Sequence, residues 1–591
     1  MQRFPGWFSF VTLVLSFGGL ISLEPARAVP SQIAQFPSLP TVPTVPTAPP
    51  LPSVPSVPAA APVTPPAPPK RIEDQLKDFA YWSNLCNLQA DGGKYEEAVT
   101  ACETAIVLRP NDAGIWADYG GVLLQQKKYP EAIAALEQSL KLNAKTSLAL
   151  AYKCVALDGM GRREEALDAC EQALKVDGNW GRRSPALAWF QRGRILSQQN
   201  QYEPSLVSFD RVLLLEPQNS LALSHRCEVL VYLGQAQQAV KACDLALASN
   251  SQWGDKTPAF AWTNRGFANR TLGNGQAAIA DYDQALSLTP TDAATWAAQG
   301  MVFEQLGRFS EALNSYNQAQ QLSPKSSLVL VSKCTVLNIL NQYEEAQKAC
   351  DQAMQGDGVW REMGVAQAWN QRSQALTGLG KFEEALVSAN RAVGMRPSWG
   401  EAWSDRAVVL WYLKQYEEAL TSVKRAILLN PQDARAWANQ GRIWRTLKQP
   451  DRALASYREA LKFNPNDAAT WANQSVVQWT IGDYPAALNS ANQAVRANPR
   501  LVQGWMNRAV ALVALEDYVQ AQNSYERAIS LDKTNAEAWT GLGLVLAQLE
   551  EYSDALRALQ TAVSLNPNQA SAQRALQAIL QAQQRSQKKP R

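Results

Sequence analysis

The sequence predicts an all-α solenoid of about fourteen copies of a 34-residue helical hairpin. Within each copy, positions 4, 7, 8 and 11 and then positions 20, 24 and 27 recur at helical spacing, which makes two apolar stripes. A Pro or Asn-Pro near position 32 ends the second helix in many copies. One hairpin cannot bury both stripes alone, so the copies must stack. The period is clearest at position 4, which holds Trp82, Trp116, Trp189, Trp262, Trp296, Trp369, Trp403, Trp437, Trp471, Trp505 and Trp539.

The full repeat is easiest to follow in residues 434–467. This copy has Trp at position 4, Gly at 8, Ala at 20, Tyr at 24, Ala at 27 and Pro at 32. The pattern resembles the tetratricopeptide repeat (TPR) family over more than four-fifths of the chain, from about Phe79 to Gln569. The resemblance implies two antiparallel helices per copy, A and B, stacked into a right-handed superhelix with a concave groove.

The segments around the repeats suggest export. Residues 1–28 are typical of a secretory signal peptide, with Arg3 before an apolar stretch and Ala26-Arg27-Ala28 as a cleavage site. The alternative is an uncleaved membrane anchor, because the charge-free run approaches the ~20 residues of a membrane span. Residues 29–70 form a Pro-rich linker, interpreted as a semi-rigid spacer rather than a ligand for a proline-recognition domain. We expect the solenoid over 71–569, a capping helix over 570–585 and a basic tail over 586–591. The style of leader and linker is similar to that of exported bacterial proteins, including cyanobacterial ones.

The eight cysteines fall in four pairs, each sixteen residues apart, at positions 8 and 24 of their copies. In the repeat that the family resemblance implies, these positions face each other across the hairpin, so we predict four disulfides. Reduced cysteine as a small core residue is the alternative. Zinc binding is disfavoured because the pairs are far apart and the chain has one histidine. The pairs are Cys86 with Cys102, Cys154 with Cys170, Cys227 with Cys243 and Cys334 with Cys350.

Three of these copies share a further pattern. They replace the Trp of position 4 with Leu, lack the Pro of position 32, and end in Trp180, Trp253 or Trp360 followed by about five inserted residues. One interpretation is that each Trp packs over a lengthened turn. The other is that the three loops make a recurring contact along one edge. The first is favoured, because inserts in repeats usually lie in loops.

The candidate binding site follows from the resemblance, since TPR ligands usually contact helix A around positions 2, 5, 9, 12 and 13. In residues 400–535 these positions combine aromatic, aliphatic and arginine side chains, which are enriched at binding hot spots. The alternative is that they pack between repeats. The sequence has no match to the TPR carboxylate clamp, which binds the C-terminus of a peptide. Polar residues followed by Arg at positions 6 and 7, such as Asn264-Arg265, are expected to form hydrogen bonds between repeats. The predicted groove residues are Val408, Trp411, Tyr412, Arg435, Arg442, Arg445, Val476, Trp479, Met506 and Val510.

Other functions lack a sequence signal. No catalytic constellation, phosphate loop or metal motif is visible, and His225, the sole histidine, is expected on a solvated helix face. The net charge of +3 with interspersed signs does not favour nucleic acid. We therefore expect a non-catalytic scaffold without cofactor or small-molecule substrate that binds an extended peptide or helix in a periplasm, lumen or envelope. A glycan- or polymer-binding surface, or an accessory subunit of a transferase or secretion complex, are the alternatives, and membrane attachment is expected only through an uncleaved signal.

Overall fold

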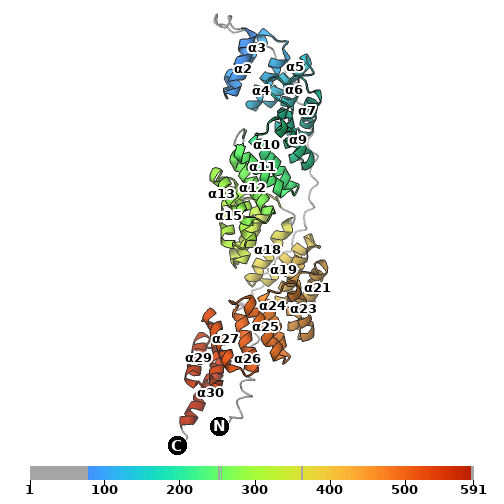
Figure 1. The fold of residues 1–591 in the computed structure, drawn as a ribbon. Coiled ribbons are helices and arrows are strands. Elements are labelled where there is room, and N and C mark those ends of the chain that lie inside the picture. Colours follow the sequence, from blue (N-terminus) through green and yellow to red (C-terminus); the bar gives the residue numbers. More distant parts are fainter. Residues whose placement is uncertain (1–77, 250–252, 255, 361–363, 588–591) are drawn as a thin grey trace, which may run out of the picture. The chain divides into compact units, whose positions relative to one another are not determined.

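A computed structural model describes residues 78–249, 253–254, 256–360 and 364–587. The predicted signal peptide and linker, and the last residues of the tail, lie outside them. The described residues contain helices and no strands (Figure 1). They divide into two units, an N-terminal unit that ends at Pro324 and a C-terminal unit that begins at Lys325.

The N-terminal unit holds seven helical hairpins, which match the first seven predicted copies. Its helices are α2 (Phe79–Asp91), α3 (Tyr95–Leu108), α4 (Ala113–Gln125), α5 (Tyr129–Leu142), α6 (Ser147–Gly159), α7 (Arg163–Val176), α8 (Ala186–Gln198), α9 (Tyr202–Leu215), α10 (Ser220–Tyr232), α11 (Ala236–Ser249), α12 (Pro258–Thr271), α13 (Gly275–Leu288), α14 (Ala293–Gln305) and α15 (Phe309–Leu322).

The C-terminal unit holds the other seven hairpins and a final single helix at the predicted cap. Its helices are α16 (Ser327–Ile339), α17 (Tyr343–Met354), α18 (Gly364–Gly378), α19 (Phe382–Met395), α20 (Gly400–Tyr412), α21 (Tyr416–Leu429), α22 (Ala434–Thr446), α23 (Pro450–Phe463), α24 (Ala468–Thr480), α25 (Tyr484–Ala497), α26 (Val502–Ala514), α27 (Tyr518–Leu531), α28 (Ala536–Gln548), α29 (Tyr552–Leu565) and α30 (Ala570–Gln587).

Local chemistry fixes the ends of each hairpin. An Asp or Asn at position 34 often caps the next helix A, as Asp467 does by accepting from the backbone N–H groups of Ala469 and Thr470. Helix A then ends in a left-handed residue at position 15, such as Gly482 with φ of 84° or Lys448 with φ of 56°. These signals explain why helices A and B keep nearly constant lengths along the chain.

The core of a hairpin depends on complementary sizes at positions 8 and 24. Where position 8 is Gly, position 24 holds a large side chain, as in Gly441 with Tyr457 and Gly266 with Tyr282. A Cβ added to either glycine would lie 2.5 Å from the Tyr ring, so an alanine there would force the ring to shift. The paired cysteines occupy the same two positions, and so they fill the same space with two small residues.

Two side chains of helix A tie successive copies together. The Trp of position 4 donates from its indole N–H to the backbone carbonyl of position 32 in the preceding copy, at 2.9 Å for both Trp437 to Pro431 and Trp505 to Pro499. The Arg of position 7 bonds to position 25 of the preceding copy, which confirms the predicted contacts between repeats. These pairs are Arg192–Glu171, Arg226–Asp210, Arg265–Asp244, Arg372–Asp351, Arg406–Asn390 and Arg508–Asn492.

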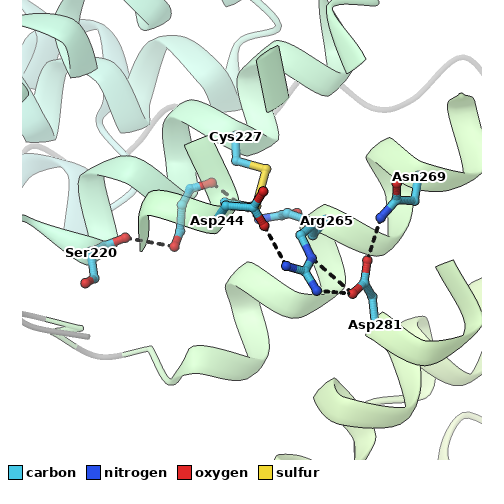
Figure 2. The surroundings of a disulfide bond; sticks show 9 residues. Ser220, Cys227, Asp244, Arg265, Asn269 and Asp281 are labelled. Carbon is cyan, nitrogen blue, oxygen red and sulfur yellow. Dashed lines mark hydrogen bonds and ion pairs between the residues drawn. A yellow bond between two sulfur atoms is a disulfide. The ribbon is translucent and has the colours of Figure 1, made fainter. Parts of the chain in front are cut away.

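Arg265 shows the full arrangement beside the Cys227 bridge (Figure 2). Its guanidinium bonds to Asp244 of the preceding copy and to Asp281 of its own, each at 2.6 Å. Asp281 also accepts from the amide of Asn269 at 2.8 Å, and its side chain is 4 % exposed. The buried carboxylate is therefore paired from two sides, and the arginine holds two copies in register.

Candidate functional site

Trp411 and Arg442 form the centre of the predicted binding surface in the C-terminal unit. Trp411 comes from the last turn of α20 and Arg442 from α22, and the guanidinium lies 4.8 Å from the indole centroid. The Trp411 indole N–H donates to Thr446 Oγ1 at 2.9 Å, and Arg442 donates to Asn439 Oδ1 at 3.0 Å. Both side chains are half-buried, so each leaves part of its surface exposed to solvent while packing fixes its position.

Arg445 and Arg435 differ in how their charges are compensated. Arg445 donates to the neutral side chain of Asn473 in α24 at 3.1 Å. Arg435 forms an ion pair with Asp405 of α20 at 2.7 Å, and this carboxylate raises the pKa of the guanidinium. Within the described part of the chain, no carboxylate forms an ion pair with Arg442 or Arg445. The surface therefore carries two cations without an acidic partner.

Burial makes this cationic pair electrostatically unusual. It lowers the pKa of the Arg442 guanidinium, and the charge of Arg445 acts in the same direction. It also raises the pKa of the Tyr457 hydroxyl to about 12. Arg442 Nε, the Tyr457 hydroxyl and the Trp479 indole N–H are buried and have no hydrogen-bond partner among the described residues. Buried polar groups of this kind cost free energy when they have no partner.

Most of the remaining predicted groove residues are half-buried. Val408, Val476, Trp479 and Val510 are half-buried on helices A of α20, α24 and α26. Tyr412 is also half-buried, but its ring stacks on Phe382 with centroids 4.7 Å apart.

Met506 differs from the prediction. It is 7 % exposed and packs in a core cluster with residues of α26 to α30, although it occupies a groove position of its copy. Trp411, Arg442, Arg445 and Trp479 together are called the arginine–tryptophan surface.

The three insert tryptophans pack inward. Trp180 contacts the cluster of Leu150, and Trp253 and Trp360 contact those of Leu223 and Leu330. Each thus packs against the core cluster that contains the Leu at position 4 of its own copy. This placement agrees with packing over a lengthened turn.

A serine that the sequence analysis did not single out holds each of these turns. Ser147, Ser220 and Ser327 open helix A of the three copies, and each hydroxyl donates to a carbonyl in the last turns of helix B, at 2.8–3.0 Å. The Ser147 and Ser327 hydroxyls also accept from the glycine N–H that follows helix B. The signal was available, since only these copies place Ser at position 1.

The cysteines join in the four predicted pairs. Their Cα atoms lie 4.9–5.5 Å apart, within the range that a bridge requires, and all eight side chains are buried. None of the described cysteines is free.

His225 corrects a prediction. Instead of lying on a solvated face, it is 8 % exposed and stacks on Phe209 with centroids 5.4 Å apart. Phe190 and Phe260 contact its edges, so aromatic residues from three other helices enclose it. Its Nδ1 lies 3.0 Å from Glu228.

Over the described ranges, no group of His, Cys, Asp or Glu side chains could hold a metal ion. Over the same ranges, no helix is both long and apolar enough to cross a membrane.

Comparison with known families decides the assignment. Tetratricopeptide repeat profiles match residues 89–153, 186–219, 264–327, 366–398, 404–468, 474–521 and 512–580, which together exceed half of the chain. The chain belongs to the tetratricopeptide repeat family. Its TPR hairpins support a role as a protein–protein interaction scaffold, a fold that is generally non-catalytic. A comparison with curated proteins finds no match.

Solved structures with similar folds include other repeat proteins. The crystal structure of the APC/C hetero-tetramer Cut9–Hcn1 is 15 % identical, with a TM-score of 0.41, and the match covers 86 % of this TPR chain and 97 % of that chain. YrrB, described as a TPR protein with an unusual peptide-binding site, is 19 % identical, with a TM-score of 0.28, and the match covers 32 % of this chain and 96 % of that chain. Neither likeness assigns a partner.

Proposed function

We propose that this TPR protein is an exported scaffold that binds an acidic segment of a partner protein on the arginine–tryptophan surface. The segment is an extended peptide or a helix with an acidic end. One observation carries the proposal: Arg442 and Arg445 have no carboxylate partner among the described residues, and Arg442 lies over the half-buried Trp411. A partner carboxylate would supply the missing charge, and its apolar neighbours would cover Trp411 and Trp479.

The mechanism is docking on a preformed surface. Packing and hydrogen bonds already fix Trp411 and Arg442, so binding costs little ordering of the scaffold. Four disulfide pairs support an oxidising compartment such as a periplasm or envelope, because such bonds are rare in a reducing cytosol. Assembly of a membrane or envelope complex is the setting that we propose for this scaffold.

Site-specific crosslinking tests the location of the surface. Thr480 is exposed next to Trp479, whereas Arg458 is exposed on helix B of the adjacent hairpin. Benzoylphenylalanine placed at Thr480 should capture in cells a specific protein that the same group at Arg458 does not. Equal capture from both positions, or a product at Arg458 alone, would reject this surface as the docking site.

A further inference from the structure

The first insert, residues 181–185, reaches back across the N-terminal unit to an earlier copy. It follows the third copy, but its Arg183 forms an ion pair at 3.1 Å with Asp91, at the end of α2 in the first copy. Arg182 contacts the same carboxylate. Repeats in a solenoid usually contact only their neighbours, so an insert that spans a whole copy is an exception. The feature is specific to this insert, because the other two lack consecutive arginines.

A second carboxylate lies beside the two arginines. Asp118 of α4 accepts from the side-chain amide of Asn87 in α2 at 2.9 Å. Burial raises the pKa of the Asp118 carboxyl, and the hydrogen bond from Asn87 opposes that rise. The charges of Arg182 and Arg183 oppose it as well, whereas the charge of Asp112 adds to it. Removal of the two guanidiniums would therefore leave an acidic site.

The chain next to the insert is held by a backbone hydrogen bond, whereas the arginine side chains are partly exposed. The Leu148 N–H, at the start of α6, donates to the Asn179 carbonyl at 3.1 Å. The Arg182 and Arg183 side chains are 53 % and 55 % exposed, and that of Asp91 is 41 % exposed. Ion pairs with this exposure contribute little to stability, so a competing cation can displace the arginine side chains while the loop stays in place.

We propose that Asp91 and Asp118 form a binding site for a basic segment of a partner protein, and that the two insert arginines occupy this site until the partner displaces them. An arginine or lysine of the partner pairs with the carboxylates in their place. The insert itself shows the chemistry that the site accepts, because Arg183 and Arg182 already bind Asp91. The insert arginines thus act as an internal competitor, which only a partner of sufficient affinity displaces. This site goes beyond the arginine–tryptophan surface, which binds an acidic segment.

The test uses the protein with its disulfides intact and a rhodamine-labelled Trp-Gly-Arg-Arg-Ser-Pro amide, the sequence of residues 180–185. An analogue carries Gln in place of both Arg. Fluorescence anisotropy should show the Arg peptide binding about fivefold more tightly to Arg182→Gln/Arg183→Gln than to the wild type, because partly exposed ion pairs no longer compete. The Gln peptide should show no such gain. Arg162→Gln/Arg163→Gln, at exposed positions around the start of α7, removes the same charge and should bind as the wild type does.

Two changes at Asp91 separate lost binding from lost folding. In the Arg182→Gln/Arg183→Gln background, Asp91→Asn should remove the gain, and Asp91→Glu, which restores the charge, should recover it. Equal binding of the Arg peptide to the wild type and the double variant would overturn the proposal. The same gain in Arg162→Gln/Arg163→Gln, a gain that persists in Asp91→Asn, or no saturable binding would also overturn it.

A further competition decides whether the site takes a peptide segment. Free N-acetylarginine amide that competes at the same concentration as the peptide would overturn that assignment. None of these results bears on the arginine–tryptophan surface, because all of the variants lie in the N-terminal unit.

Discussion

Because Gly at position 8 packs against a large ring at position 24, a Gly→Ala substitution should destabilise the protein at this position. The same substitution at an exposed helical glycine should stabilise it. In Gly441→Ala, the new methyl group would lie 2.5 Å from Tyr457 Cε1, and Tyr457 is fully buried. Overpacking of this kind costs about 1–3 kcal/mol. The gain in helix propensity from Gly to Ala returns up to about 1 kcal/mol. We therefore expect a net loss of about 1–2 kcal/mol in the hairpin of α22 and α23.

Gly394→Ala is the matched control. Gly394 lies near the end of α19, it is exposed, and a Cβ there would meet no atom within 4 Å. Only the propensity gain remains, so this variant should be stabilised by about 0.5 kcal/mol.

Local hydrogen exchange is the appropriate assay, because long repeat arrays need not unfold in one step. Mass spectrometry of the α22–α23 peptides should show faster exchange in Gly441→Ala. The α19 peptides should show slower exchange in Gly394→Ala. If both variants slowed exchange, the ring at position 24 would be free to move, and the size-complementarity argument would be refuted.

Three further predictions concern the contacts that hold the repeats. Reduction of the disulfides should lower the free energy of unfolding by roughly 3 kcal/mol for each sixteen-residue loop, according to the chain-entropy model. Hydrogen exchange should then become faster only in the copies that contain cysteines. Unchanged exchange in those copies would contradict a stabilising role for the disulfides. Arg265→Ala should destabilise its hairpins by about 2 kcal/mol in thermal melts, because it leaves the buried Asp281 without its cation, and an unchanged melt would show the ion pairs to be dispensable. Backbone N–H groups of Val359 and Ser327 donate to Asp357 and lower its pKa. The ionised carboxylate therefore stabilises the folded state above the unfolded pKa of about 3.9, and this stability is lost as the pH falls through the lower folded pKa. In Asp357→Asn, local hydrogen exchange at acidic pH should lose this pH dependence. The same pH dependence in both proteins would show that Asp357 is not its cause.

Much of the fold could be predicted from the sequence because the signals recur in phase. Trp at position 4, the small residues at positions 8 and 20 and the breaker at position 32 repeat often enough to fix all fourteen hairpins. The positions of Arg265 and its equivalents also sufficed to predict bonds between repeats. The cysteine pairing followed from the TPR resemblance, because positions 8 and 24 of that repeat face each other and Cys227 and Cys243 occupy them.

The site could be predicted only in part, because a position number does not tell which side chains the next copy covers. Met506 has a groove position but packs into the core of α26–α30. His225 is enclosed by Phe190, Phe209 and Phe260, whose approach depends on three other helices.

Partner affinity of charge variants tests the central claim most directly. Once crosslinking at Thr480 has identified a partner segment, its dissociation constant should be measured for wild type, Arg442→Ala, Arg445→Ala and Arg452→Ala. Arg452 is the control because it lies 4.7 Å from the Trp444 ring centroid, nearly the geometry of Arg442 over Trp411, but outside the proposed surface. We predict a loss of about tenfold or more for Arg442→Ala and Arg445→Ala, and none for Arg452→Ala. Equal affinities for all four folded proteins would contradict the arginine–tryptophan surface as the site where the partner docks.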